Sequence, residues 1–191
     1  MPGLRYGRCS VGGMSAMIEV ELRSFVSEDE FARLLSFFAA SAKARGDDEQ
    51  VTFYFNGPED LRIQQNKTHS KVWLKKGKLH DDAREEIEIK CAKDDFARLE
   101  SLFLALGYTV NIKWFRKRKS FDWNGITVTL DDTKGYGKIL ELELLTTEAQ
   151  KDAALRRLKE CFNELRIAVT PKEEFERKFA FYKENWKSLI S

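Results

Sequence analysis

The chain has 191 residues, enough for one domain with a sizeable core. Its 33 basic and 31 acidic residues leave a formal net charge of +2, which gives little reason to expect nucleic-acid binding. No apolar run approaches the roughly 20 residues of a membrane span, and the odd cysteine count argues against a disulfide framework. We expect a cytoplasmic protein without membrane association, with a disordered leader over residues 1–17 and a single domain over residues 18–191.

Three segments alternate glutamate with an aliphatic residue, and each predicts a β-strand whose carboxylates share one face. These segments are Glu19-Val20-Glu21-Leu22-Arg23, Glu86-Ile87-Glu88-Ile89-Lys90 and Glu141-Leu142-Glu143-Leu144. A sheet could simply turn such a face to water. Three repeats, two of them ending in a cation, also fit a sheet whose charged face lines an interior while helices cover the aliphatic face.

The first of these segments belongs to a strand expected over Ile18–Phe25, and a helix is predicted directly after it. Ser27 and Glu30 have the spacing of a capping box, in which each side chain accepts from the other residue's backbone N–H. The helix is expected to end near Arg45-Gly46, with one apolar stripe formed by Phe31, Leu34, Leu35 and Phe38.

One short strand and a hairpin are predicted next. Val51–Phe55 is rich in β-branched and aromatic residues and is followed by a turn. Leu61–Gln64 and Lys71–Lys76 then read as a hairpin. Arg62 and Lys75 are the cations that we expect to point inward.

The middle of the chain contains the second glutamate segment and a strongly basic strand. Arg84–Lys90 carries both signs of charge on one face, and the following helix has an apolar stripe over Phe96–Leu106. In the strand Val110–Phe121, Arg116 and Arg118 share a face. This strand could be a solvated edge strand whose cations prevent pairing with another strand, or the charges on one of its faces could contribute to a site.

The last strands are joined by turns with clear signatures. Asn124-Gly125 predicts a tight hairpin, followed by a strand over Ile126–Leu130. Asp131–Gly137 reads as a loop, and the third glutamate segment lies in a strand over Lys138–Leu145.

Two helices complete the chain. Thr147 with Gln150 opens the first, and Thr170-Pro171-Lys172-Glu173 is interpreted as a capping box with proline at the first helical position of the second. Lys178 lies beside the aromatic stripe of the second helix and could reach past the sheet edge.

Carboxylates that face one another must be neutralised. Two of them about 4 Å apart repel by roughly 4 kcal/mol at an effective dielectric near 20. Mg²⁺ or Mn²⁺ prefers such oxygens, and interior arginines or lysines can supply further compensation. Metals and cations together suit a polyphosphate. Each glutamate segment alone is more typical of an exposed sheet face, but all three with Arg62, Lys75 and Arg118 between them favour a site.

The order of these motifs resembles the CYTH superfamily, the triphosphate tunnel metalloenzymes, which includes thiamine triphosphatases, tripolyphosphatases and class IV adenylyl cyclases. The likeness runs from Ile18 to about Trp186, and its motifs are Glu19-Val20-Glu21-Leu22-Arg23, Leu61-Arg62, Leu74-Lys75, Arg84-Glu85-Glu86-Ile87-Glu88, Phe103–Gly107, Arg116-Lys117-Arg118, Leu130-Asp131 and Gly137–Glu143.

The resemblance implies an α+β fold, an eight-stranded antiparallel barrel-like tunnel with a polar interior and helices packed outside. It implies Mg²⁺ or Mn²⁺ as cofactor, with metal ligands at Glu19, Glu21, Asp131, Glu141 and Glu143. It gives catalytic roles to Arg23, Glu86 and Glu88, and triphosphate contacts to Arg23, Arg62, Lys75, Arg84, Arg118 and Lys178.

Three positions depart from the family pattern. Arg23 stands where a lysine is usual, and Gln64 stands where many members carry a second arginine. The stretch Val51–Gly57 lacks the usual Tyr-Asp-Thr. Guanidinium and ammonium groups differ in shape and hydration, so the first of these replacements is not conservative.

The leading hypothesis is a metal-dependent triphosphatase acting on inorganic tripolyphosphate, a nucleoside triphosphate or thiamine triphosphate. A class IV adenylyl cyclase is the nearest rival hypothesis, although no His-Phe opening of the cyclase type precedes Glu19. A tunnel that only binds polyphosphate and an ordinary interaction module are two further hypotheses. The expected partner is a small triphosphate compound, with neither nucleic acid nor membrane, and the protein is expected to be a monomer or a homodimer.

Overall fold

The computed structural model describes residues 17–75 and 86–191. The strands are β1 (Met17–Val26), β2 (Lys43–Phe55), β3 (Asp60–Gln65), β4 (Ser70–Lys75), β5 (Glu86–Cys91), β6 (Val110–Trp123), β7 (Ile126–Thr133) and β8 (Gly137–Thr147). The helices are α1 (Glu28–Ser41), α2 (Phe96–Ala105), α3 (Lys151–Glu164) and α4 (Lys172–Leu189), with short 3₁₀ turns at Lys93–Asp95 and Glu148–Gln150. None of the helices in this described part of the chain is long and apolar enough to cross a membrane.

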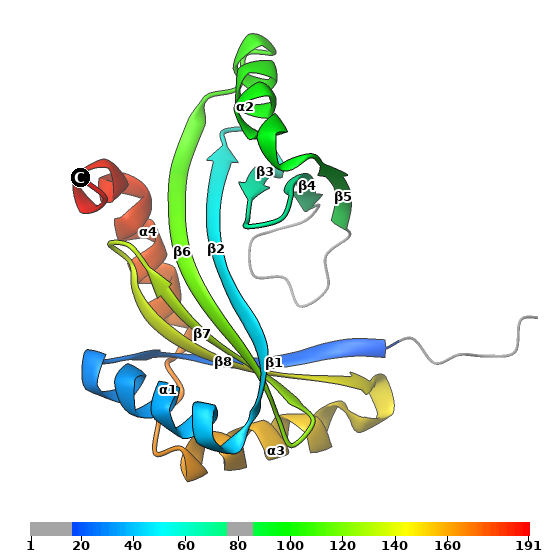
Figure 1. Cartoon of the computed structure of the whole chain (residues 1–191), viewed down its shortest axis with the longest axis vertical. Helices are drawn as coiled ribbons and strands as arrows, with labels where there is room; N and C mark the ends of the chain where they lie inside the picture. The colour runs from blue at the N-terminus through cyan, green and yellow to red at the C-terminus, as the bar shows by residue number, and fades with distance from the viewer. Residues whose placement is uncertain (1–16, 76–85) are drawn as a thin grey trace, which may run out of the picture.

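The strands form one eight-stranded sheet in the order β1-β8-β7-β6-β2-β3-β4-β5, and all neighbours are antiparallel. The sheet bends strongly, because the long strands β2 and β6 curve from the β1–β8 end to the short strands β3, β4 and β5 (Figure 1). The α+β class and the eight antiparallel strands are thus confirmed. Within the described residues, β1 and β5 are the two edges of the sheet, so it stays open.

Helices α1 and α3 cover one face of the β1–β8–β7 half, which we call the outer face (Figure 1). The aliphatic residues of the β1 and β8 glutamate segments lie on this face, and Leu142 is fully buried against the helices. Leu34, Phe38 and Leu158 are buried with it in the main core. Period-two alternation therefore sends the glutamates of β1 and β8 to the opposite face, which we call the inner face.

A second, smaller core fixes the far end of the sheet. Phe53 and Ile63 are buried there, and the ring of Phe96 on α2 packs against Phe53 with centroids 4.9 Å apart. Gly107 ends α2 with a φ of +88°, the left-handed conformation expected at a helix C-terminus. This core holds β3 and β4 in place beneath α2 (Figure 1).

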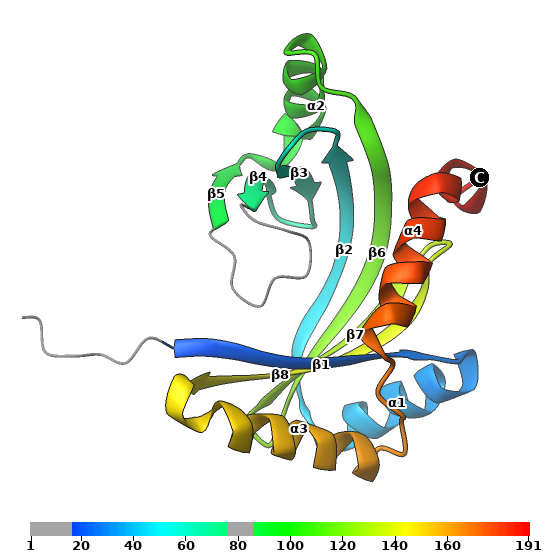
Figure 2. The same ribbon diagram turned by 180° about the vertical axis from the view of Figure 1, so that it is seen from behind.

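The chain crosses the β1 edge between α3 and α4. Thr170 Oγ1 accepts a hydrogen bond from the Phe25 backbone N–H at 3.0 Å and lies 2.8 Å from Ser24 Oγ. The predicted capping box is therefore wrong: the N-cap of α4 is Pro171, which has no side-chain cap bond. The Thr170 hydroxyl instead binds a backbone N–H on the outer edge of strand β1, that of Phe25. Helix α4 then passes beside β6 and β7 (Figure 2).

Three expected boundaries are also wrong. Helix α1 ends at Ser41, and strand β2 already begins at Lys43 instead of Val51. Asp131–Thr133 continue strand β7 and are not part of a loop. The capping box at Ser27 and Glu30 and the Asn124-Gly125 turn are confirmed, the latter with φ values of +54° and +77°.

Candidate functional site

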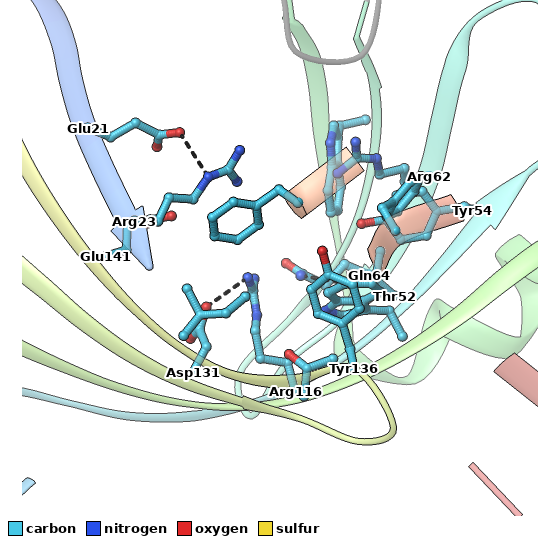
Figure 3. Close-up of a pocket in the computed structure, with 16 residues that line it drawn as sticks. Glu21, Arg23, Thr52, Tyr54, Arg62, Gln64, Arg116, Asp131, Tyr136 and Glu141 are labelled. Carbon is cyan, nitrogen blue, oxygen red and sulfur yellow. Dashed lines mark hydrogen bonds and ion pairs between the residues drawn. The ribbon is translucent and has the colours of Figure 1, made fainter. Parts of the chain in front are cut away.

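The inner face contains a cavity of about 350 Å³ between the β1–β8 end of the sheet and strands β2, β3 and β6 (Figure 3). Carboxylates, guanidinium groups and aromatic rings all contribute to its wall. The lining residues are Glu21, Arg23, Thr52, Tyr54, Arg62, Gln64, Trp73, Trp114, Arg116, Asp131, Thr133, Tyr136, Ile139, Glu141, Phe175 and Phe179. Charged side chains from strands far apart in the sequence thus share one space.

One end of the cavity is acidic. Glu21 of β1 and Glu143 of β8 are direct cross-strand partners, and Glu141 is the partner of Arg23. Burial raises the pKa of Glu141, and the nearby Glu21 and Asp131 raise it further. Burial also raises the pKa of Glu143, together with repulsion from Glu19, Glu141 and Glu21. The two glutamate segments therefore act as one electrostatically coupled group that a cation would relieve.

Two arginines of β6 bind one carboxylate at the cavity, and Arg116 and Asp131 line it whereas Arg118 does not. Arg118 makes a bidentate bond to Asp131, with Nε 2.7 Å from Oδ1 and Nη2 2.6 Å from Oδ2. Arg116 Nη1 donates to the same Oδ2 at 3.2 Å. Glu141 Oε1 is 3.8 Å from Arg118 Nη2, so the arginine pair meets the acidic end here. The carboxylate of Asp131 and the bond to it raise the pKa of Arg118, although burial opposes this.

Arg62 lies across the cavity on β3, stacked among aromatic rings. Its guanidinium carbon is 4.3 Å from the Tyr54 ring centre and 5.5 Å from that of Trp73, and its Nε donates to Asp60 Oδ1 at 2.6 Å. Such stacking suits a planar guanidinium and limits its motion. Arg62 therefore faces Glu21 and Arg23 from the opposite wall (Figure 3).

Arg23 stands at the acidic end but also contacts α4. Its Nε is 3.9 Å from Glu21 Oε1, and its guanidinium carbon is 4.9 Å from the ring centre of Phe175. Lys178 is held nearby, with Nζ 3.8 Å from the Phe25 ring centre, but it is not among the lining residues. Helix α4 thus forms one side of the cavity through Phe175 and Phe179.

The third glutamate segment lies at the other edge of the sheet. Glu88 is opposite Trp73, and its carboxylate is bound by Lys71 Nζ at 2.7 Å, a bond that lowers the pKa of Glu88. Glu88 is not among the residues that line the cavity. The backbones of Lys75 and Glu86 are paired strand partners, whereas Arg84 lies outside the described residues.

The structure brings Arg116 into the cavity wall, whereas the sequence motifs had predicted a role for Arg118 alone. Burial lowers the pKa of Arg116, and Asp131 opposes that change. The period-two pattern already placed Arg116 and Arg118 on one face of the strand, so it could have predicted a role for Arg116 as well. Tyr54, Tyr136 and Gln50 were missed because no spacing distinguishes them from ordinary strand and loop residues. Burial raises the pKa of Tyr136 to about 12, so its hydroxyl stays protonated at neutral pH.

The site contains oxygen donors of the kind that a hard divalent cation prefers. Glu21 and Glu141 line the cavity, whereas Glu19 and Glu143 lie beside them on β1 and β8 and do not line it. Burial and the neighbouring carboxylates raise the pKa values of Glu141 and Glu143. Asp131 differs from them because both of its oxygens bind arginine. Across residues 17–75 and 86–191, no three acidic, histidine or cysteine side chains are clustered tightly enough to hold a metal.

A curved, open antiparallel sheet with carboxylates and arginines around a cavity on its inner face defines an α+β protein with a charged inner cavity. The chain belongs to the CYTH domain family, whose model matches residues 17–180.

Similar proteins agree with this assignment. "Putative adenylate cyclase MJ0240" of Methanocaldococcus jannaschii is 29% identical over 168 residues, which cover 80% of this chain and 91% of that protein. A conserved hypothetical protein of Pyrococcus furiosus matches with a TM-score of 0.66 at 22% identity over 81% of this chain and 96% of its own. A structure described as a putative adenylate cyclase of Vibrio parahaemolyticus gives a TM-score of 0.60 at 17% identity, covering 82% of this chain and 96% of its own. These two structures show the fold alone.

Proposed function

We propose that the protein is a divalent-metal-dependent triphosphatase whose substrate binds in the inner cavity. The observation that carries the proposal is the opposition of charges across this cavity. Glu21 and Glu141 line one end, while Arg62 and Arg116 line the other walls (Figure 3). A triphosphate needs both groups, because cations hold its oxygens and carboxylates hold the metal that accompanies it.

The residues of the chain have distinct tasks in this proposal. Arg62 and Arg116 bind phosphate oxygens, and Arg23 stabilises the charge that develops on the transferred phosphoryl group. Arg118 keeps Asp131 in place and thereby sets the direction of Arg116. Glu19, Glu21, Glu141 and Glu143 would hold the metal. A bound Mg²⁺ or Mn²⁺ supplies a polarised phosphate oxygen and a water molecule of lowered pKa.

The roles of the remaining predicted residues belong to the same proposal. Lys178 would contact a bound substrate from α4, although it rests on the Phe25 ring and does not line the cavity. Glu88 would need to exchange Lys71 for another partner before it could act on water or metal. Glu86, Lys75 and Arg84 retain the roles that the family resemblance implies.

The direct test is a substrate panel with Mg²⁺, Mn²⁺ and a chelator. Tripolyphosphate, ATP and thiamine triphosphate are each incubated with the wild type, Glu141→Gln and the charge-matched surface control Glu160→Gln, which lies exposed on α3. We expect phosphate release that needs metal, falls about 100-fold or more in Glu141→Gln, and is unchanged in the control. Binding of the substrates without metal-dependent turnover would overturn the proposal.

A second candidate is an adenylyl cyclase, and the name of the Methanocaldococcus jannaschii relative favours it. The same cavity could hold ATP while the ribose 3′ hydroxyl attacks the α-phosphorus. The two reactions give different products: cyclic AMP and pyrophosphate in one case, and ADP and phosphate in the other. Chromatography of the ATP reaction therefore decides between them.

A further inference from the structure

Gln50 is placed directly against Arg116 on the inner face. The two residues are cross-strand partners in β2 and β6. Gln50 Oε1 accepts a hydrogen bond from Arg116 Nε at 2.9 Å and a second one from Arg116 Nη2. One amide oxygen thus binds the edge of the guanidinium that faces away from Asp131.

The amide of Gln50 is itself held in one orientation. Its Nε2 donates to Asp48 Oδ2 at 2.8 Å, which turns the oxygen toward Arg116. Gln64 Nε2 donates to the same oxygen at 3.3 Å and to Thr52 Oγ1 at 3.0 Å. Gln64 is only 7% exposed, so this polar group is protected from water and its geometry is restricted.

Arg116 itself binds one carboxylate and one neutral amide. Its Nη1 shares Asp131 Oδ2 with Arg118, which binds both oxygens of that carboxylate and also lies 3.8 Å from Glu141 Oε1. The other hydrogen-bond partner of Arg116, Gln50, is neutral. A glutamate in place of Gln50 could still accept from Arg116, but it would lose the donor to Asp48 and would add a negative charge beside the guanidinium.

We propose that Gln50 is a positioning residue that directs Arg116 into the cavity without neutralising it, so that the guanidinium stays available to a phosphate anion. Gln64 and Thr52 support this role by fixing the amide. The proposal rests on the proposed triphosphate site and adds to it a determinant of anion affinity.

The main test replaces Gln50 by an isosteric carboxylate, Gln50→Glu. Tripolyphosphate binding is measured by calorimetry in the presence of chelator at low and high salt, and KM and kcat are measured with Mg²⁺. We expect the Kd and the KM to rise about tenfold and the salt dependence of binding to become weaker. A residue that merely fills space would leave the Kd and its salt dependence unchanged.

A second variant, Gln50→Met, removes the acceptor but adds no charge. Arg116 then loses its orientation and keeps its charge, so KM should rise severalfold while the salt dependence of binding stays at the wild-type level. This variant tests the proposal even if Gln50→Glu does not fold. An unchanged KM in Gln50→Met would overturn the positioning role.

The control is Gln65→Glu, which adds the same charge on the neighbouring strand. The Gln65 side chain reaches Lys93 O at 2.9 Å and does not line the cavity, so tripolyphosphate affinity should not change. An equal loss in Gln65→Glu and Gln50→Glu would show a general charge effect and overturn the proposal. If the wild type neither binds nor hydrolyses tripolyphosphate, ATP or thiamine triphosphate, the proposed function fails together with this inference. Equal binding by wild type and Gln50→Glu overturns the inference alone.

Discussion

Asp131 and Arg118 form a bidentate ion pair across β7 and β6, with bonds of 2.7 and 2.6 Å, and only 5% of the Asp131 side chain is exposed. The same carboxylate also accepts from Arg116. Asp131 is therefore the counter-charge for two guanidinium groups at once. Its replacement should affect stability as well as the site.

The change Asp131→Asn removes the carboxylate that both arginines bind, leaves Arg118 with only the longer contact to Glu141, and turns an amide N–H toward one of the arginines. We expect the free energy of unfolding to fall by about 3 kcal/mol, as for one partner removed from a buried ion pair. Urea denaturation measures this loss. The control is Asp47→Asn, because Asp47 forms an exposed ion pair with Lys119 and its loss should cost less than about 1 kcal/mol. Equal small losses in both variants would contradict the prediction.

The acidic end of the cavity should make stability depend on pH. The pKa values of Glu141 and Glu143 are raised in the folded protein, so the folded state holds these protons more tightly than the unfolded chain. Their contribution is fully present below the unfolded-state pKa and is lost as pH rises through the folded-state values. Denaturation of the wild type and Glu141→Gln from pH 4 to 7 should show the variant gaining relative stability with rising pH. Parallel curves would refute the coupling.

Divalent cations should offset the loss of stability that the wild type shows as pH rises. If Mg²⁺ or Mn²⁺ binds the acidic end of the folded protein only, a concentration of 100 Kd stabilises it by about 2.7 kcal/mol. The melting temperature of the wild type should therefore rise with metal at pH 7, and that of a Glu21→Gln, Glu141→Gln double variant should rise much less. A rise of the same size in both proteins would place the metal elsewhere.

Arg116 should contribute to affinity for triphosphate, and its neighbour Lys117 should not. Arg116→Gln removes a cavity cation, so we expect the Kd for tripolyphosphate to increase by about 10- to 100-fold. Lys117 is exposed and lies on the opposite face of the same strand, which makes Lys117→Gln the matched control. Calorimetric titration compares the two variants, and similar affinities would argue against a phosphate contact by Arg116.

Thr170 should stabilise the edge of the sheet instead of the start of α4. Thr170→Val keeps the shape of the side chain but leaves the Phe25 N–H without its acceptor, which should cost about 1 to 2 kcal/mol. Hydrogen exchange should become faster at the Phe25 amide, and Thr170→Ser should restore its protection. Faster exchange confined to Glu173 and Glu174 would instead support a helix cap.

Local sequence was sufficient where a structure depends on neighbours in the chain. The Ser27 and Glu30 capping box and the Asn124-Gly125 turn involve groups three residues apart or fewer, and both are confirmed. The faces of β1 and β8 were also predicted correctly, since alternation along a strand fixes which side each residue occupies. These features require no knowledge of the partner strand.

Strand β2 shows where local sequence was not sufficient. Its first half, Lys43–Gln50, lacks β-branched residues and hydrophobic alternation, and we expected a helix to extend to Arg45-Gly46. In the structure this half pairs with the basic part of β6, where Asp47 lies opposite Lys119 and Glu49 opposite Lys117. The acidic residues of this half complement the basic residues of a segment about 70 residues away in the chain. Local β-propensity does not include such a long-range pairing.

The sequence by itself determined that Glu19, Glu21, Glu141 and Glu143 would share one face of their strands and that aliphatic residues would meet helices on the other. Only the tertiary structure decided which cations face these carboxylates. Cross-strand pairing placed Asp131 on Arg118 and Gln50 on Arg116, and the bend of the sheet brought Arg62 across from Glu21. The reason is physical: alternation fixes a face, whereas the register and curvature that create a cavity arise from contacts between distant segments.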